Sequence, residues 1–230
     1  HSAVSFESTT SANMIEGIKQ ISDNNLPVDT WWIDAGWHPC PDPKTSKRNW
    51  AWGVGNWAAD PDRYPDGMKP VADAAHDRGF KFLLWFEPER VMPGTWMHDN
   101  HPDWILAPGE FPLEQQYQAR DGYHLLDLGN PEALEWLKSK VSSMVAEVGI
   151  DIYRHDFNMY PLNYWRQHDP KQQQGLTEIR YIMGLYDFLD TLLDDHSNLV
   201  IDNCASGGRR IDFEMLRRSL VLWRSDLCWE

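Results

Sequence analysis

Acidic side chains stand at the ends of several short apolar runs in this sequence. The clearest run covers 150–155; it follows a helical segment closed by Gly149 and leads directly into Asp156 and a polar loop. Such a run is typical of a buried strand that delivers the acid to its carboxyl end. Five other apolar runs end in the same way, at Asp34, Glu87, Asp127, Asp202 and Asp226.

Carboxylates gathered at one edge of a parallel sheet can bind a metal ion or cleave a glycosidic bond. A metal site would ordinarily include His ligands, and the strand ends supply mainly His38 and His155. Neighbouring strand residues face opposite ways, so His155 and Asp156 are not expected to share an ion. Glycoside cleavage needs an ionised carboxylate and a protonated carboxyl, about 5–5.5 Å apart in retaining enzymes. The pattern therefore favours glycosidic chemistry without a metal or other cofactor, and it offers more than two candidate acids.

Segments with helical periodicity separate the apolar runs. Helices are predicted over 8–22, 66–79, 131–148, 176–194 and 212–218. Strands are predicted over 4–7, 28–34, 80–87, 123–128, 150–156, 199–202 and 220–225. Asn130 and Pro131 suit the start of the third helix, because Asn caps free backbone N–H groups and Pro fits the first turn.

Alternating strands and helices predict a parallel sheet with right-handed crossovers. The expected fold class is α/β, in the form of a (β/α)8 TIM-type barrel whose acids meet at the carboxyl ends of the strands. About seven strands are recognisable where the barrel takes eight, so the barrel is expected to be truncated, with its eighth strand missing. A doubly wound open sheet is the alternative, but its phosphate-binding Gly-rich first turn is absent.

Charge and cysteine content restrict the partners and the compartment. The formal net charge is −14, with no basic stripe, which excludes a nucleic-acid partner because nucleic-acid affinity comes mainly from clustered Lys and Arg. The sequence contains no run of about 18 apolar residues, so it predicts no membrane span. Three cysteines without paired spacing argue against a zinc site or a disulfide framework, and favour a reducing, cytoplasmic compartment. The chain starts at His1 rather than Met, so the natural N-terminus is expected to lie upstream.

Tryptophan is unusually abundant, with 13 residues in 230. Many lie beside predicted strand ends or in the following loops, as Trp31, Trp32, Trp37, Trp50, Trp52, Trp57, Trp85 and Trp165. Most are expected to be core residues, since Trp is well buried on average. A few are candidates for aromatic platforms under a sugar ring, and the irregular loop 35–65 that carries several of them suits a functional lid better than a second domain.

Six short motifs follow one another along the chain. They read YPDGMKPVAD at 64–73, FLLWFEPE at 82–89, HPDW at 101–104, DFN at 156–158, CASGGRRID at 204–212 and WRSD at 223–226. In this order they resemble the catalytic-domain motifs of glycoside hydrolase family 36, the α-galactosidases and their relatives. The resemblance spans nearly the whole chain and implies a retaining enzyme with a (β/α)8 barrel. Residues 1–230 would then be a single catalytic barrel domain, a fragment without the family's flanking β-rich domains.

The resemblance also implies roles for individual residues. Asp156 is expected to be the nucleophile and Asp226 the acid/base, so Asp156 must stay ionised while Asp226 holds a proton. Asp34 and Trp37 match a motif that binds sugar hydroxyls, and Arg154 stands where the family has a Lys that contacts the ring.

Six further residues are expected to bind or surround the sugar. Cys204 and the two glycines after it match the turn beside the sugar 2-position, although Cys204 alternatively serves as a small buried apolar side chain. The full set is Trp85, Glu87, Asn158, Cys204, Gly207 and Gly208.

Several of these polar residues have a structural alternative. A strand-end Asp can cap the following helix or pair with Arg, which is the interpretation favoured for Asp127 and Asp202. Asp212 is expected to cap the short helix behind it, and Arg209 and Arg210 to neutralise nearby acids.

Three departures from the family pattern bear on the sugar. Ala35 replaces the second Asp of Asp-Asp-Gly-Trp, which removes an acceptor for a sugar hydroxyl. Arg154 and His155 replace Lys-Trp, and a guanidinium contacts hydroxyls differently from an ammonium. Leu-Cys-Trp at 227–229 replaces Asn-Thr-Asp. A site built around particular hydroxyls discriminates strongly, so these changes leave the sugar open.

The function implied is a retaining, exo-acting α-glycosidase, most simply an α-galactosidase. Its substrate would be an α-linked oligosaccharide or glycoside, cleaved through a covalent glycosyl-enzyme. Within the same family, an α-N-acetylgalactosaminidase or a galactosyl transglycosylase are the alternatives. A non-catalytic carbohydrate-binding domain or an inactive fragment is the alternative from another class, and a homo-oligomer fits any of these functions.

Overall fold

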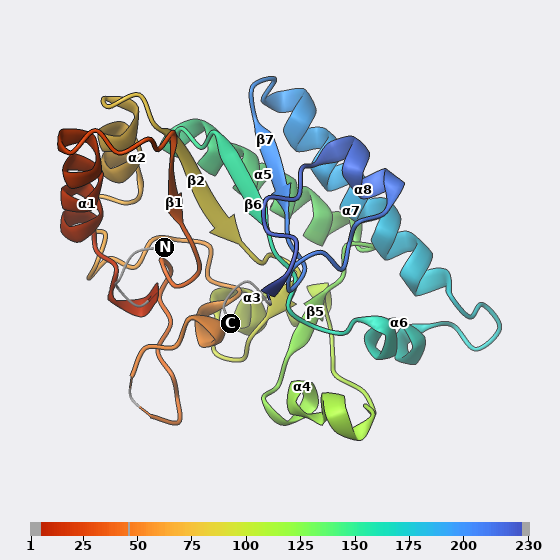
Figure 1. Cartoon of the computed structure of the whole chain (residues 1–230). Helices are drawn as coiled ribbons and strands as arrows, with labels where there is room; N and C mark the ends of the chain where they lie inside the picture. Colours follow the sequence, from red (N-terminus) through yellow and green to blue (C-terminus); the bar gives the residue numbers. More distant parts are fainter. Residues whose placement is uncertain (1–5, 46, 227–230) are drawn as a thin grey trace.

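A parallel sheet of four strands forms the centre of the mixed α/β fold (Figure 1). The computed structural model describes residues 6–45 and 47–226. The strands are β1 (Thr30–Ile33), β2 (Lys81–Phe86), β6 (Ile152–His155) and β7 (Val200–Asn203), in the order β1-β2-β6-β7. All three pairings are parallel, so the carboxyl ends of the four strands meet at one edge.

The helices that flank these strands in the sequence pack beside one another in chain order. They are α1 (Ser11–Asp23), α2 (Lys69–His76), α5 (Pro131–Val148), α7 (Leu176–Asp195) and α8 (Phe213–Arg218). Contacts join α1 to α2, α2 to α5, α5 to α7 and α7 to α8. A doubly wound sheet reverses its strand order at a switch point, whereas here strands and helices advance in one direction. The arrangement therefore argues against the doubly wound alternative.

Helix α5 begins and ends where the sequence predicts. The Asn130 side chain accepts a hydrogen bond from the backbone N–H of Glu132, Pro131 is the first helical residue, and Gly149 adopts a left-handed φ of 82° at the end. These are the ordinary starting and stopping devices of a helix. Gly149 turns the chain directly toward β6, which positions the residues after that strand.

A second, antiparallel sheet contradicts part of the predicted strand pattern. It consists of β3 (Arg90–Val91), β4 (Ile105–Leu106) and β5 (His124–Leu126), in the order β3-β5-β4. The run 123–128 was predicted to join the parallel sheet, but its short strand pairs instead with two strands of the segment after β2. Asp127 consequently follows an antiparallel strand and accepts a hydrogen bond from the backbone N–H of Gly129 (2.9 Å).

The remaining helices are short and lie mostly beyond the carboxyl ends of the parallel strands (Figure 1). They are η1 (Phe6–Ser8), η2 (Trp50–Gly53), α3 (Trp96–Asn100), η3 (Pro102–Trp104), η4 (Leu113–Gln115), α4 (Gln116–Arg120) and α6 (Leu162–His168). The predicted strand 4–7 lies partly outside the described residues, and its end belongs to η1.

The predicted strand 220–225 reduces to a single bridge. Leu220 pairs in parallel with Asp202, but Leu222 donates its backbone N–H to the Asp202 side chain (2.9 Å) rather than to a neighbouring backbone carbonyl. The carboxylate thus replaces a backbone acceptor and the chain leaves the sheet. The sheet therefore continues only as far as Leu220 on this side.

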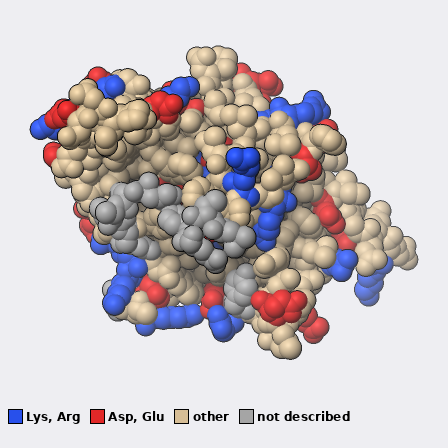
Figure 2. Space-filling model, in the orientation of Figure 1, with Lys and Arg blue, Asp and Glu red and all other residues tan. Residues whose placement is uncertain are grey.

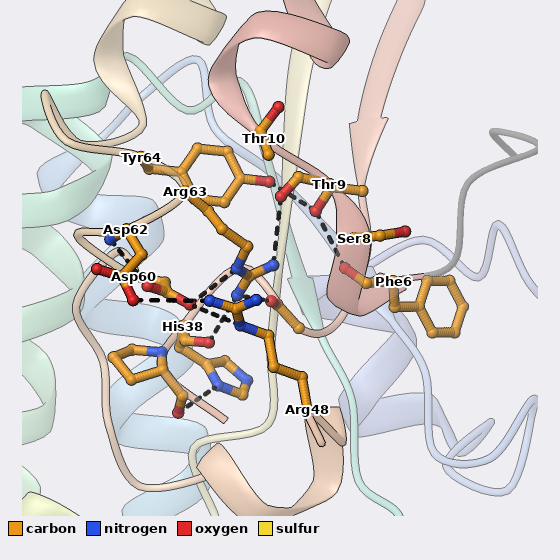
Figure 3. A network of polar contacts seen from close by, with 12 residues as sticks. Phe6, Ser8, Thr9, Thr10, His38, Arg48, Asp60, Asp62, Arg63 and Tyr64 are labelled. Atoms are coloured by element: carbon orange, nitrogen blue, oxygen red, sulfur yellow. Dashed lines mark hydrogen bonds and ion pairs between the residues drawn. The ribbon is translucent and has the colours of Figure 1, made fainter. Parts of the chain in front are cut away.

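The loop 35–65 is held by a buried ionic network (Figure 3). Arg63 pairs with Asp60 (Nε–Oδ2 2.8 Å) and donates to the backbone carbonyls of Gly36, His38 (3.0 Å) and Thr9 (3.3 Å). Nearly all of the Arg63 surface is buried. One guanidinium therefore fixes both ends of the loop to the segment before α1.

The surface mixes both signs of charge. Figure 2 shows Lys and Arg side chains interspersed with Asp and Glu on one face of the molecule. None of the helices in the described part of the chain has the length and apolar character needed to cross a membrane.

We expect Gly184→Ala to destabilise the protein, although Ala usually improves a helix interior. Gly184 lies on the buried face of α7, and a Cβ there would collide with the backbone carbonyl oxygen of Leu128. Overpacking of this kind costs about 1–3 kcal/mol. Urea unfolding should show the loss, while Met183→Ala, at an exposed neighbour, should change stability by less than about 0.5 kcal/mol. Equal midpoints for the two variants would contradict the expected collision.

Candidate active site

A cavity of about 310 Å³ lies at the carboxyl ends of the parallel strands. Asp156 and Asp226, far apart in the sequence, line this one cavity together. Of the other residues predicted to bind the sugar, five also line it: Asp34, Trp85, Arg154, Asn158 and Cys204. Six lining residues were not among the predicted site residues: Phe6, Trp32, Ala35, Trp50, Ser206 and Trp223.

Asp156 is a buried carboxylate surrounded by hydrogen-bond donors. Its Oδ2 accepts from Trp85 Nε1 (2.9 Å) and Asn158 Nδ2 (2.7 Å), and its Oδ1 accepts from the backbone N–H of Phe157 (2.7 Å). Burial alone would raise the pKa of Asp156, but the donors and the Arg154 charge outweigh it and hold the pKa below its ordinary value. The site therefore keeps this acid ionised without exposing it.

Glu87 lies behind the cavity rather than on its wall. Its side chain is fully buried; Oε1 accepts the Asn158 backbone N–H (2.6 Å) and Oε2 accepts from Arg90 Nη2 (2.6 Å). The expectation that Glu87 surrounds the sugar is therefore corrected. Glu87 instead holds Asn158, which in turn donates a hydrogen bond to Asp156. Burial raises the pKa of Glu87 to about 7, with Arg90 opposing and the Asp156 charge adding to the increase.

Arg90 extends this support to the aromatic wall. Its guanidinium lies 5.0 Å from the Trp50 ring centroid and 4.9 Å from that of Tyr123. Trp50 in turn meets Trp85 edge to face, with ring centroids 5.6 Å apart. Arg90, which does not line the cavity, thus orients Trp50, which does.

Asp34 and Arg154 form a second polar group in the cavity. The backbone N–H of Ala35 donates to Asp34 Oδ1 (2.8 Å). Burial raises the pKa of Asp34, while the Arg154 charge opposes the increase. Arg154 itself is paired with buried Asp202 and lies 4.5 Å from the Trp32 ring centroid. The structural interpretation of Asp202 as an Arg partner is confirmed.

The turn after β7 brings small residues against Asp156. The Cys204 thiol contacts the Asp156 carboxylate, and burial together with that negative charge raises the thiol pKa, so the group stays protonated. Ser206, at a left-handed φ of 50°, directs its backbone N–H at Asp156 Oδ1 (3.4 Å) and its hydroxyl at Asn158 Oδ1 (2.7 Å). Ser206 belongs to the motif at 204–212, but the sequence does not predict its left-handed φ, and so does not predict that it faces the cavity.

Gly207 and Gly208 do not line the cavity, which corrects their predicted contact with the sugar. A Cβ on Gly207 would lie 3.0 Å from Ser225 Cα and 3.1 Å from the Asp226 backbone nitrogen. Gly208 donates its backbone N–H to the Arg224 carbonyl (3.1 Å). The two glycines therefore allow the turn to support the segment that carries Asp226.

Trp37 is likewise behind the wall rather than on it. The side chain is fully buried and donates Nε1 to the Trp85 carbonyl (2.8 Å). It packs with Trp57 and Phe86 in the core, so its large apolar surface is used for packing. The predicted direct contact of Trp37 with the sugar is corrected to support of Trp85.

Asp226 differs from Asp156 in its surroundings. It is exposed, and its Oδ1 accepts a hydrogen bond from Trp223 Nε1 (2.9 Å). Trp223 meets Trp32 edge to face across the cavity wall, with centroids 6.5 Å apart. One acid is thus buried and held ionised, and the other is exposed to solvent.

A buried ionic network connects the strand ends beneath the site. Glu89 accepts from both Arg210 nitrogens (2.6 and 2.8 Å), from Tyr181 Oη, and contacts His155 Nε2 (2.7 Å). Burial would raise the Glu89 pKa, but the Arg210 charge and these hydrogen bonds hold it well below its usual range. Both Arg209 and Arg210 were predicted to neutralise nearby acids. Arg210 does so by pairing with Glu89, whereas Arg209 donates to the backbone carbonyls of Ala205 and Phe157.

Asp212 lies outside the cavity, at the start of α8. Asp212 caps α8 by accepting from the backbone N–H groups of Glu214 (2.9 Å) and Met215 (3.0 Å), as predicted. Among residues 6–45 and 47–226, no group of three or more His, Cys, Asp or Glu side chains is arranged to hold a metal ion. The departure from the family pattern at 227–229 falls outside the described residues.

The Melibiase family model matches residues 3–228, almost the full chain. The chain belongs to this family, the melibiases of glycoside hydrolase family 36. Among curated members, it is 34% identical over 175 residues to alpha-galactosidase 2 of Pediococcus pentosaceus, covering 76% of this chain and 24% of that protein. It is 28% identical over 212 residues to alpha-galactosidase Mel36A of Lactobacillus acidophilus, covering 91% and 28%.

Solved structures of the family share the fold of this chain. The alpha-galactosidase of Lactobacillus brevis has a TM-score of 0.80 at 29% identity, covering 96% of this chain and 28% of that one. A Geobacillus stearothermophilus family 36 alpha-galactosidase in complex with raffinose has a TM-score of 0.82 at 23% identity, covering 97% and 29%. The chain thus spans about a quarter of the length of its curated relatives.

We expect Glu89→Gln to destabilise the protein by about 3–5 kcal/mol, because it leaves the Arg210 guanidinium buried without its counter-charge. Glu214→Gln removes a partner of Arg217 and Arg218 at the surface and should cost less than about 1 kcal/mol. Chemical unfolding of both variants checks the contrast.

A second variant separates loss of the pair from loss of packing. Replacing both partners, as Glu89→Gln with Arg210→Met, should recover part of the lost stability, since no unpaired charge remains. Additive losses in the double variant would argue against a coupled ion pair.

Proposed function

We propose that the protein containing this chain is a retaining, exo-acting α-galactosidase. The observation that carries the proposal is the shared cavity of Asp156 and Asp226, one acid buried and hydrogen-bonded and the other exposed. Retaining glycosidases need this division of labour, since one carboxylate attacks the anomeric carbon while the other supplies a proton. Family membership and the names of the curated relatives support galactose as the sugar.

The reaction we propose is a double displacement. The ionised Asp156 carboxylate forms a bond to the anomeric carbon as the glycosidic carbon–oxygen bond breaks, and Asp226 donates its proton to the departing oxygen. Water then attacks the anomeric carbon, Asp226 takes a proton from it, and Asp156 is released as a carboxylate. Asp34 and Arg154, which line the same cavity, are proposed to bind hydroxyls of the terminal sugar.

The same proposal includes a (β/α)8 barrel for the catalytic domain. Two features support it: strands β1, β2, β6 and β7 advance in one direction with their helices in the same order, and the site lies at their carboxyl ends. Related enzymes with similar folds are described in complex with stachyose and raffinose, which supports short α-linked oligosaccharides as substrates.

Substitution of the two acids tests the proposal in the full-length protein. Asp156→Asn should abolish turnover of both raffinose and p-nitrophenyl α-galactoside, because no covalent intermediate can form. Asp226→Asn should slow raffinose about 10²–10⁴-fold but the nitrophenyl substrate much less, since nitrophenolate leaves without a proton. Asp127→Asn, at the acid outside the cavity, is the matched control and should keep normal turnover. Unchanged rates in Asp156→Asn would refute the assignment, and galactose binding without turnover in the unmodified protein would favour a carbohydrate-binding module.

The pH profile tests how Asp156 is kept ionised. Removing the Asn158 amide donor in Asn158→Ala should raise the pKa of Asp156 and move the acidic limb of kcat/KM to higher pH. A hydrogen bond to a charged group is worth about 1.5–3 kcal/mol, which corresponds to about one pH unit or more. Ser206→Ala removes a hydroxyl that contacts Asn158 rather than Asp156, so its limb should move in the same direction but less than in Asn158→Ala. A limb that does not move in Asn158→Ala would exclude this donor as a cause.

A further inference from the structure

Arg209 is a fixed cation beside the catalytic cavity. Its Nε donates to the Ala205 carbonyl (2.7 Å), and its Nη2 donates to the Phe157 carbonyl (3.1 Å) and to the Ser206 hydroxyl (2.9 Å). Ser206 itself lines the cavity. The guanidinium also lies 5.1 Å from the ring centroid of Tyr160. These contacts join the turn after β7 to the loop after β6 and hold the guanidinium in one place.

The contacts leave part of this guanidinium without a partner. Nε and Nη2 are hydrogen-bonded, whereas Nη1 has no acceptor in the described part of the chain. The acceptors are carbonyl and hydroxyl oxygens, which carry no charge. Arg209 is exposed and forms no ion pair with any described residue, unlike Arg210, which is paired with buried Glu89. A fixed positive charge with free N–H donors therefore remains available to a ligand.

The turn that carries Arg209 lies against the segment that carries the proposed proton donor. Gly208 donates its backbone N–H to the Arg224 carbonyl (3.1 Å), and Arg224 is followed closely by Asp226. In the proposed reaction Asp226 protonates the departing oxygen, so the leaving group extends from the cavity on this side. Cys204, which is expected beside the 2-position of the terminal sugar, is buried deeper in the site. Arg209 is therefore placed beside the leaving group.

Arg224 adds a second positive charge on this side. It is exposed, and it also forms no ion pair within residues 6–45 and 47–226. The whole chain has a formal net charge of −14, so two neighbouring arginine positions without acidic partners run against the general balance of charge. In the first step of the proposed reaction Asp226 holds a proton and does not neutralise them. A negatively charged ligand group is complementary to this side of the cavity.

We propose that Arg209 binds an anionic oxygen group on the leaving part of the substrate, so that the protein selects α-galactosides with a negatively charged leaving group. The inference rests on the proposed function, because it names the leaving group of the same reaction. A guanidinium suits an oxyanion, since its planar N–H groups can donate to two oxygens of one carboxylate or phosphate. Carboxylates and phosphates share this chemistry, and substrates of both kinds distinguish them.

Two matched pairs of substrates test the proposal in the full-length protein. Melibionate carries a carboxylate where melibiitol carries a hydroxyl, and melibiose 1-phosphate carries a phosphate where melibiose carries a hydroxyl. All four contain the same galactose and the same bond to be cleaved. We expect kcat/KM for an anionic substrate to exceed that for its neutral partner by about 10-fold, the effect of one hydrogen bond between charged groups. Added salt should lower this ratio, because exposed charges are screened.

Variants assign the preference to Arg209. Arg209→Gln should make kcat/KM equal within each pair, since the positive charge is lost. Arg209→Lys keeps the charge but not the planar set of donors, and should retain only part of the preference. Arg217→Gln makes the matched change at an exposed arginine of α8, which is paired with Glu214, and should leave both ratios unaltered.

The outcomes separate this inference from the proposed function. Equal kcat/KM within each pair in the unmodified protein would overturn the anion site and leave the α-galactosidase assignment intact. No turnover of any of the four would overturn both. A preference that ignores salt, or that survives in Arg209→Gln, would overturn the role of Arg209. If Arg209→Gln fails to fold, Arg209→Met keeps the stem beside Tyr160 and carries the same expectation.

Discussion

The site depends on keeping a largely buried carboxylate ionised. Asp156 is buried, and burial by itself favours the neutral acid. Trp85, Asn158 and the backbone N–H of Phe157 reverse this by hydrogen bonding to both carboxylate oxygens. Each donor must be held in position, because a donor that swings away restores the cost of burial. Much of the surrounding structure can be understood as support for these donors.

Buried ion pairs supply that support in a second layer. Glu87 holds the backbone of Asn158 and the guanidinium of Arg90, and Arg90 orients Trp50. Buried pairs of this kind contribute little net stability compared with apolar packing, but losing one partner is costly. Their contribution here is geometric, since each pair holds a neighbouring backbone or aromatic group in position.

The second acid is positioned by close backbone contact rather than by charge. Gly207 and Gly208 let the turn after β7 touch residues 224–226, and the Glu89–Arg210 pair holds that turn from below. The two acids are thus placed by different means. Asp156 depends on donors that stabilise its charge, whereas Asp226 depends on a backbone fit that leaves its side chain exposed.

The order of the motifs and their resemblance to a known family singled out the pair Asp156 and Asp226, which line one cavity. The sequence by itself determined the local features: the strands β1, β2, β6 and β7 with acids at their ends, and the caps at Asn130 and Asp212. These follow from neighbouring residues, whose spacing and hydrogen-bonding capacity are readable along the chain. Tertiary structure alone decided that Glu87 and Trp37 lie behind the wall, that 123–128 joins an antiparallel sheet, and that Phe6, Ser206 and Trp223 line the cavity. The physical reason is that strand pairing and side-chain burial depend on segments brought together from distant parts of the chain, and periodicity within one segment carries no information about which partner it meets.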